Sequence, residues 1–266
     1  MTTADDHALA RDLAEEAGQL LLALRAGHSR EQGGGPDELR KAGDRRSHEF
    51  LAARLAELRP SDAVLSEEGV DDKGRLSADR VWIVDPLDGT REFGEEGRAD
   101  WAVHVALWER AAGNGAAGDL TAGAVALPAQ GTVLSTLNPF SPTDPAPSVS
   151  SAPLRMVVSR SRASQLVKDV AVRLGAELVP CGSAGAKAAT VITGETDVYL
   201  HSGGFYEWDT AAPVAVARAA GLHASRIDGG SLTYNRDDPL LPDILVCRPA
   251  IAGLLLDAIR EVTHAH

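Results

Sequence analysis

Cysteine, aromatic residues and net positive charge are all scarce in this sequence of 266 residues. The two cysteines, Cys181 and Cys247, lie far apart and outside any C-x-x-C pattern, which argues against a structural zinc site or a disulfide framework. We expect two free thiols in a reducing cytoplasm. The chain has 26 Lys and Arg against 38 Asp and Glu, a formal net charge of −12. This balance disfavours binding to nucleic acid or to an anionic membrane, because both require a basic surface.

Long apolar runs are also missing. None approaches the ~18 residues that a membrane-spanning helix needs, and the beginning of the chain, MTTADDHALA, lacks the regions of a signal peptide. What is present suits a globular protein, with 44% hydrophobic and 24% charged residues. At about 150 residues per typical domain, the length fits one large domain or two packed subdomains. An acidic protein that handles a phosphate ester must neutralise it locally, and a bound divalent cation does so.

The first half of the chain combines helices and strands. Leucines at helical spacing predict a helix over 4–26 and another over 44–58, separated by a glycine-rich loop at 28–38. Strand-forming segments then follow, with a predicted hairpin connection at 113–118. The predicted strands cover residues 64–65, 81–84, 101–108, 121–127 and 132–136.

The second half follows a different pattern. Residues 138–153 are rich in proline and serine, which predicts a loop or a seam between an N-terminal subdomain, 1–150, and a C-terminal one, 151–266. Beyond the seam, strands and helices alternate, and this predicts a layered α/β structure. The predicted strands are 154–158, 177–179, 197–201 and 244–247, and the predicted helices are 162–174, 184–193, 209–220 and 250–262.

The segment VWIVDPLDGTREF raises a specific question, because a buried strand ends on two carboxylates three residues apart. The proline between them favours a turn, and Gly89 lets the backbone bend. Asp85, Asp88 and the Leu87 carbonyl could therefore point to one place, and Thr90 would add a hydroxyl able to orient water. Oxygen ligands of this kind suit Mg²⁺ or Mn²⁺. By itself, the motif is also compatible with a strand end whose two acids are simply solvated.

Three further acids stand at ends of predicted elements. Glu67 follows the strand at 64–65, Asp209 opens a helix in EWDTAAP, and Asp44 opens the helix at 44–58. Each alone is an ordinary surface acid or helix N-cap. Two metal ions about 3.5–4 Å apart need a shared carboxylate and several terminal ones. Glu67 and Asp209, with the two acids of the DPLD motif, supply that set.

Three segments resemble the inositol monophosphatase-like, lithium-sensitive phosphatases: LSEEG (65–69), WIVDPLDGTREF (82–93) and EWDTAAP (207–213). They occur in the family's order and roughly at its spacing, so the resemblance spans nearly the whole chain. Within the family, the chain is most similar to the CysQ branch, the 3′(2′),5′-bisphosphate nucleotidases, which it also resembles in SRSR (159–162). The resemblance implies an α/β (α+β) fold layered α/β/α/β/α, a homodimer, a cytoplasmic location, and Mg²⁺-dependent hydrolysis of a small phosphorylated substrate.

The resemblance also implies roles for individual residues. Metal ligands for two or three Mg²⁺ ions, with Mn²⁺ as a substitute, are implied at Glu67, Asp85, the Leu87 carbonyl, Asp88 and Asp209. Asp44 and Thr90 are implied to orient or deprotonate the attacking water. The implied substrate-binding residues are Glu67, Leu87, Asp88, Gly89, Thr90, Gly182, Ser183, Lys187, Glu207 and Asp209.

The implied reaction is in-line attack of water on a phosphate monoester. The sequence contains no G-x-S-x-G elbow and no C-x5-R loop that would provide a covalent nucleophile. The branch implies removal of the 3′-phosphate from adenosine 3′,5′-bisphosphate (PAP), or from PAPS, in sulfur assimilation. The second phosphate of such a substrate needs a basic partner. The candidates are Arg40, Lys41, Arg160, Arg162 and Lys187.

Several alternatives stay open at this point. Inositol-1-phosphate and fructose 1,6-bisphosphate are alternative substrates within the same family. A haloacid-dehalogenase-type phosphatase is disfavoured, because its D-x-D-x-T motif has a different spacing from D-P-L-D. A cation-binding scaffold without turnover is the non-enzyme alternative, and Thr90 argues against it, because a passive site needs no hydroxyl to position water.

Overall fold

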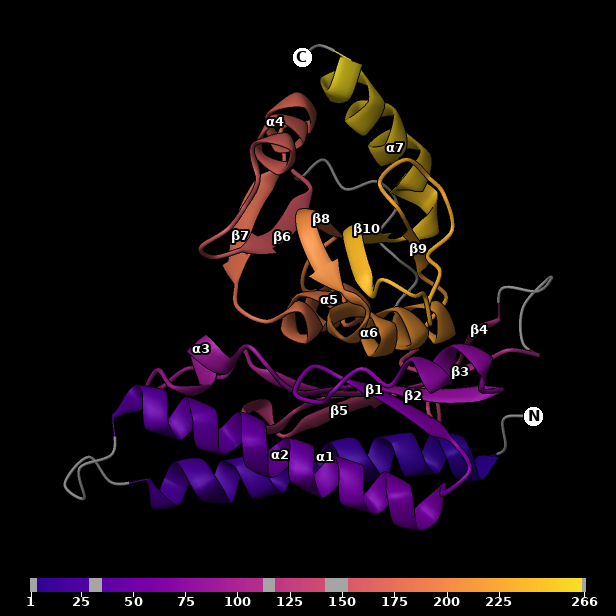
Figure 1. Ribbon diagram of the computed structural model, residues 1–266. Coiled ribbons are helices and arrows are strands. Elements are labelled where there is room, and N and C mark those ends of the chain that lie inside the picture. Colours follow the sequence, from indigo (N-terminus) through magenta and orange to yellow (C-terminus); the bar gives the residue numbers. More distant parts are fainter. Residues whose placement is uncertain (1–3, 29–34, 112–117, 142–152, 265–266) are drawn as a thin grey trace.

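Helices and strands stack in five layers in the order α/β/α/β/α (Figure 1). The structure is a computed structural model that describes residues 4–28, 35–111, 118–141 and 153–264. The outer helices beside the first sheet are α1 (Ala4–Gly27) and α2 (Pro36–Leu58). The middle layer consists of α5 (Ala184–Ile192) and α6 (Glu207–Ala219). The outer helices beside the second sheet are α4 (Gln165–Leu174) and α7 (Pro249–His264). This arrangement confirms the predicted fold class.

The first sheet has the strand order β1-β2-β3-β4-β5. Its strands are β1 (Ala63–Ser66), β2 (Arg80–Asp88), β3 (Ala102–Glu109), β4 (Asp119–Leu127) and β5 (Thr132–Ser135), and the short helix α3 (Thr90–Phe93) follows β2. β1 and β2 are parallel, and the other pairs are antiparallel. Along β2, Trp82 and Val84 join the apolar cluster of α1 and α2, whereas Val81 and Ile83 join the cluster of the middle helices. Because side chains alternate along a strand, Asp85 follows on the middle-helix face.

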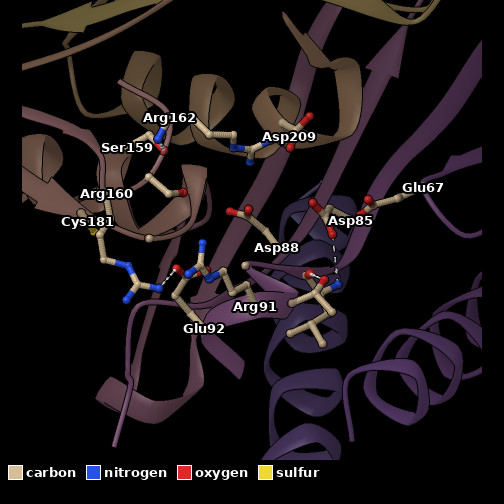
Figure 2. Close-up of a pocket in the computed structure, with 15 residues that line it drawn as sticks. Glu67, Asp85, Asp88, Arg91, Glu92, Ser159, Arg160, Arg162, Cys181 and Asp209 are labelled. Atoms are coloured by element: carbon tan, nitrogen blue, oxygen red, sulfur yellow. Dashed lines mark hydrogen bonds and ion pairs between the residues drawn. The ribbon is translucent and has the colours of Figure 1, made fainter. Parts of the chain in front are cut away.

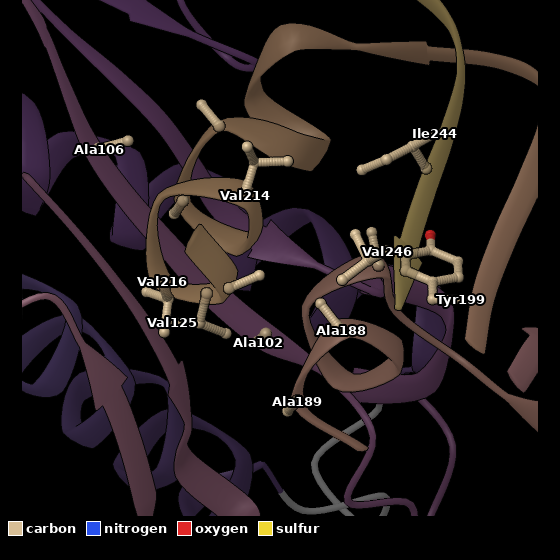
Figure 3. Packing of buried hydrophobic residues seen from close by; sticks show 14 of the residues in the cluster. Ala102, Ala106, Val125, Ala188, Ala189, Tyr199, Val214, Val216, Ile244 and Val246 are labelled. Carbon is tan, nitrogen blue, oxygen red and sulfur yellow. The ribbon is translucent and has the colours of Figure 1, made fainter. Parts of the chain in front are cut away.

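The second sheet has the order β7-β6-β8-β10-β9. Its strands are β6 (Arg155–Ser159), β7 (Glu177–Cys181), β8 (Val198–Tyr206), β9 (His223–Ser225) and β10 (Leu240–Cys247). β6 is parallel to β7 and β8, and β10 is antiparallel to both β8 and β9. Figure 3 shows Ala106 and Val125 of the first sheet, Val214 of α6 and Val246 of the second sheet in the apolar core around the middle helices. This continuous core holds the two sheets at a fixed separation.

Three predicted helix starts are wrong, and the first is that of α4, which begins at Gln165 rather than at residue 162. α2 begins at Pro36, so Asp44 lies inside the helix; a proline in the first turn, followed by Asp37 and Glu38, is a favourable helix start. α6 begins at Glu207, and Asp209 is its third residue. β9 and α3 had no predicted counterpart.

Three sequence predictions fall wholly or partly outside the described residues. They are the loop at 28–38, the hairpin connection at 113–118 and the seam at 138–153, which contains the predicted boundary between 1–150 and 151–266. The division into two subdomains therefore stays a prediction. Within the described ranges, no helix combines the length and apolarity required to cross a membrane.

Candidate active site

A cavity of about 580 Å³ lies between the two sheets, where β1, β2, β6 and β7 end (Figure 2). Residues that follow the carboxyl ends of neighbouring parallel strands meet at one edge of a sheet, so each sheet contributes a cluster of side chains. The first sheet and α3 contribute Glu67, Asp85, Leu87, Asp88, Gly89, Thr90, Arg91 and Glu92. The second half of the chain contributes Ser159, Arg160, Ser161, Arg162, Cys181, Gly182 and Asp209.

One side of the cavity is an acidic wall made by Glu67, Asp85, Asp88 and Asp209. Carboxylate oxygens of Asp85, Asp88 and Asp209 lie within 4.8 Å of one another. In a regular strand, residues three apart face opposite sides of the sheet. The β2–β3 register is irregular between Asp85 and Asp88, and this irregularity lets both carboxylates face the cavity.

Burial and mutual repulsion raise the pKa values of three carboxyl groups of the acidic wall. Burial, followed by the charges of Glu67 and Asp88, raises the pKa of Asp85 well above its ordinary value. Burial and the neighbouring Asp88 raise the pKa of Asp209 to about 6. Glu67 is exposed, but partial desolvation and the nearby Asp209 raise its pKa to about 7. Closely spaced oxygen donors that repel one another when ionised fit a hard divalent cation such as Mg²⁺.

Asp88 differs from the other members of the acidic wall. Burial opposes its ionisation, yet the charges of His104 and Lys187 outweigh burial and lower its pKa. The Gly185 N–H donates to Asp88 Oδ2 at 2.7 Å, and His104 Nε2 lies 3.1 Å from the same oxygen. The sequence reasoning missed His104, although a lone ionisable ring inside the apolar strand WAVHVALW could have indicated it.

Thr90 connects the acidic wall to α2. Its Oγ1 lies 3.1 Å from Asp44 Oδ1 and 3.1 Å from the Leu87 carbonyl oxygen. Gly89 precedes it with φ +84°, a left-handed conformation that favours glycine and lets α3 begin directly after β2. Burial, followed by the charge of Glu68, raises the pKa of Asp44 to about 6. Asp44 lies behind Thr90 rather than on the cavity surface.

Not every residue expected on the substrate side reaches the cavity. Gly182 lines it, but Ser183 is buried at the start of α5, where its Oγ accepts from the Ala186 N–H at 2.9 Å. The buried Lys187 ammonium donates to the carbonyls of Gly182 and Ser183 at 2.5 Å and 2.9 Å. Ser183 and Lys187 therefore support the cavity from behind.

Glu207 is placed elsewhere. It is fully buried, and its carboxylate accepts from the N–H groups of Asn235 and Arg236 at 2.7 Å and 2.8 Å. It does not line the cavity. The sequence prediction of a substrate contact at Glu207 is not matched by this placement, because the side chain anchors the loop before β10 to α6.

The opposite side of the cavity is a basic wall, formed by Ser159, Arg160, Ser161 and Arg162. Arg160 pairs with Glu92 at 2.7 Å and with Glu95 at 3.0 Å. The Arg162 guanidinium makes no ion pair or hydrogen bond with any other residue that the structure describes, and Figure 2 shows it directed toward the side where Asp209 lies. Of the other candidates, Arg40 pairs with Asp37, and neither Arg40 nor Lys41 lines the cavity. Arg91 lines it without having been predicted.

Cys181 also lines the cavity. Burial raises the pKa of its thiol to about 11, which keeps it protonated near neutral pH. Cys247 is buried, and both cysteines are free, as predicted.

Comparison with known proteins agrees with this geometry. Residues 4–264 match the inositol monophosphatase family. The "3′-phosphoadenosine 5′-phosphate phosphatase" of Mycobacterium leprae is 50% identical over 262 residues, covering 97% of this chain and 94% of that protein. The "3′(2′),5′-bisphosphate nucleotidase CysQ" of Escherichia coli is 30% identical, covering 75% of this chain and 81% of that protein. The crystal structure of CysQ from Bacteroides thetaiotaomicron superposes with a TM-score of 0.75 at 27% identity, covering 92% and 97% of the two chains.

Proposed function

The chain belongs to the inositol monophosphatase family and is a phosphoric monoester hydrolase, and we propose that it removes the 3′-phosphate of adenosine 3′,5′-bisphosphate with the help of bound Mg²⁺. The observation that carries this proposal is a single cavity with an acidic wall on one side and, on the other, Arg162, which has no ion-pair partner among the described residues. A bisphosphate has one phosphate for each wall. The similarity to two relatives named for such substrates supports the same choice.

The acidic wall would hold the metal ions. Glu67, Asp85 and Asp88 of the first sheet and Asp209 of α6 provide carboxylate oxygens, and the Leu87 carbonyl adds a neutral one. Bound there, divalent cations would lower the pKa of water, neutralise the phosphoryl oxygens and stabilise the leaving alkoxide. Asp88 would keep one oxygen for the cavity, since its Oδ2 is already occupied by the Gly185 N–H and His104.

Thr90 and Asp44 would handle the attacking water. A hydroxyl has one proton, so when Thr90 donates it in a hydrogen bond to Asp44, its oxygen can accept a hydrogen bond from water in the cavity. Asp44 would orient that hydroxyl and, through it, the water. Because Asp44 lies behind Thr90, it can do so without occupying the space that the phosphate needs.

The backbone N–H groups at Gly89 and Thr90 would hold the phosphate that is hydrolysed, and Arg162 would hold the second phosphate. A guanidinium matches a phosphate with two parallel hydrogen bonds. Arg160 is less available, because Glu92 and Glu95 already neutralise it. Gly182 would let the substrate approach the backbone between the two walls.

Three further features are proposed from the family resemblance alone: inhibition by Li⁺, a homodimer and a cytoplasmic location. Inositol-1-phosphate remains the second candidate substrate, because the matching family is named for it. It has no second phosphate, so it would leave Arg162 without a partner.

The test is phosphate release from adenosine 3′,5′-bisphosphate, inositol-1-phosphate and fructose 1,6-bisphosphate in parallel, with Mg²⁺ and with or without Li⁺. We expect the nucleotide to have the highest kcat/KM and Li⁺ to inhibit its hydrolysis. A higher kcat/KM for inositol-1-phosphate would keep the metal site and overturn the proposed substrate. Absence of turnover with all three, in either Mg²⁺ or Mn²⁺, would favour a passive cation site.

A further inference from the structure

His104 lies at the junction between the two halves of the acidic wall. It is in the middle of β3 and fully buried. Its neighbours Val103 and Val105 join the apolar cluster of the outer helices, whereas Ala102 and Ala106 join the cluster of the middle helices. Because side chains alternate along a strand, the imidazole faces the middle helices and the acidic wall. In the β2–β3 register, His104 stands directly opposite Asp85.

Both ring nitrogens of His104 face oxygen atoms. Nε2 lies 3.1 Å from Asp88 Oδ2, and Nδ1 lies 3.1 Å from the carbonyl oxygen of Trp208. The Trp208 carbonyl can only accept a hydrogen bond, so Nδ1 donates to it, whereas Nε2 meets the Asp88 carboxylate at ion-pair distance without a well-aligned hydrogen bond. Trp208 directly precedes Asp209 in the first turn of α6. One side chain thus connects Asp88 of the first sheet to the helical turn that carries Asp209.

We propose that His104 is a positioning residue of the active site, which holds Asp88 and the first turn of α6 in one relative position and so sets the spacing of the acidic oxygens. This inference rests on the proposed metal-dependent function. The inference goes beyond the proposed function because His104 neither lines the cavity nor supplies an oxygen ligand. Residues that orient metal ligands through hydrogen bonds typically contribute about 10–100-fold to metal affinity or activity.

Gly185 provides the space that this ring occupies. A Cβ at Gly185 would lie 2.2 Å from His104 Nε2, so a glycine is needed there for α5 to pass over the imidazole. The same glycine donates its N–H to the Asp88 oxygen that His104 contacts. Asp88 Oδ2 therefore accepts a hydrogen bond from the Gly185 N–H and lies at ion-pair distance from His104, which leaves Oδ1 as the oxygen available to the cavity.

The experiment is calorimetric titration of Mg²⁺ and Mn²⁺ into the wild-type protein and the variants H104N, H104Q and V105A, with thermal denaturation in EDTA alongside. Asn cannot span the two partners, and Gln can donate to one of them, so we expect the metal Kd to rise by about 10–100-fold in H104N and by less in H104Q. Val105 is the adjacent, equally buried residue on the opposite face of β3. We expect V105A to lower the Tm and leave the metal Kd within about twofold of wild type.

Each outcome decides the inference. Wild-type metal affinity in both His104 variants would overturn it, as would an equal loss of affinity in V105A. If H104N does not fold, H104Q decides by the same criterion. Absence of metal binding by the wild-type protein would overturn the proposed function and this inference together, whereas loss confined to the His104 variants would support both.

Discussion

The acidic and basic walls of the cavity hold their charges in opposite ways. On the acidic wall, Asp85 and Asp88 are 1% and 7% exposed, and the charges that act on Asp85 have the same sign as its own. On the basic wall, the guanidinium of Arg162 is open to solvent, and Arg160 is neutralised by two glutamates. Buried charges of like sign lower the stability of the fold unless a cation binds between them. An exposed cationic side chain has little effect on stability and is free to bind an anion. Under the proposed function, the acidic wall would determine whether the reaction occurs, and the basic wall would determine which substrate is used.

The largest loss of activity is expected when a carboxylate is removed from the acidic wall. We expect Asp88→Asn to lower kcat/KM by about 10³-fold or more, because a metal-stabilised transition state is worth several kcal/mol. The measurement is initial rates of phosphate release at saturating Mg²⁺. Asp257→Asn, on the exposed face of α7, is the matched control and should retain full activity. Activity of Asp88→Asn within tenfold of wild type would contradict the proposed metal site.

The second prediction concerns stability without metal. The pKa values of Glu67 and Asp209 are raised, to about 7 and about 6. As pH rises above the ordinary range of carboxyl groups, the unfolded chain releases these protons before the folded protein does. The free energy of unfolding therefore falls as pH rises through this window, and the part of the fall that comes from Glu67 and Asp209 levels off above about pH 7. Asp209 alone contributes on the order of 3 kcal/mol to this fall.

Urea denaturation in EDTA at about pH 5 and about pH 7.5 measures the upper part of this fall, of which Asp209 contributes about 1.4 kcal/mol. Excess Mg²⁺ should remove most of it at the higher pH, because a bound cation relieves the repulsion. The buried Glu207, whose pKa is also raised to about 7, contributes a part that metal does not relieve. Equal stability at the two pH values in EDTA would show that the acidic wall is not under electrostatic strain.

The third prediction tests whether the basic wall binds the second phosphate of the substrate. Arg162→Ala should raise KM for adenosine 3′,5′-bisphosphate by about 10–100-fold, because hydrogen bonds to a charged group are worth about 1.5–3 kcal/mol. Its effect on inositol-1-phosphate, which has one phosphate, should be much smaller. Arg160→Ala is the informative control: it removes the ion-pair partner of Glu92 in α3 and one of the partners of Glu95, so it should impair both substrates alike. Equal losses on both substrates in Arg162→Ala would remove Arg162 from the second phosphate site.

The two walls also differ in how well the sequence predicts them. The acidic residues occur in short motifs at strand ends, and the alternation of strand residues places Asp85 on the correct face. The irregular register between Asp85 and Asp88 could not be predicted, because it depends on pairing with β3. Asp44 is a favourable N-cap residue type, so the sequence predicts a helix start there, whereas the proline at residue 36 and the acids that follow it begin α2 about two turns earlier.

The prediction of substrate-binding residues is limited by the orientation of helix α6, which the sequence does not reveal. Glu207 and Asp209 are two residues apart in α6, which separates their side chains by about 200° around the helix axis. Asp209 therefore reaches the cavity while Glu207 reaches the loop at 235–236. A motif identifies which residues are close in sequence to a site, but the orientation of the helix decides which of them face it. His104 escaped prediction for a related reason: its partners come from β2 and α6, distant segments of the chain.

The smallest effect is expected at Cys181, which lies in the cavity beside the basic wall. With a pKa of about 11, its thiol would be only about 0.1% thiolate at pH 8. A thiol in that state is a poor nucleophile and a poor metal ligand, so we expect Cys181→Ser to leave kcat/KM within about twofold of wild type. Iodoacetamide should label Cys181 slowly, and mass spectrometry after turnover should find no phosphorylated protein. Rapid labelling coupled to inactivation would instead give the thiol a part in the reaction, and a phosphorylated chain would contradict direct attack by water.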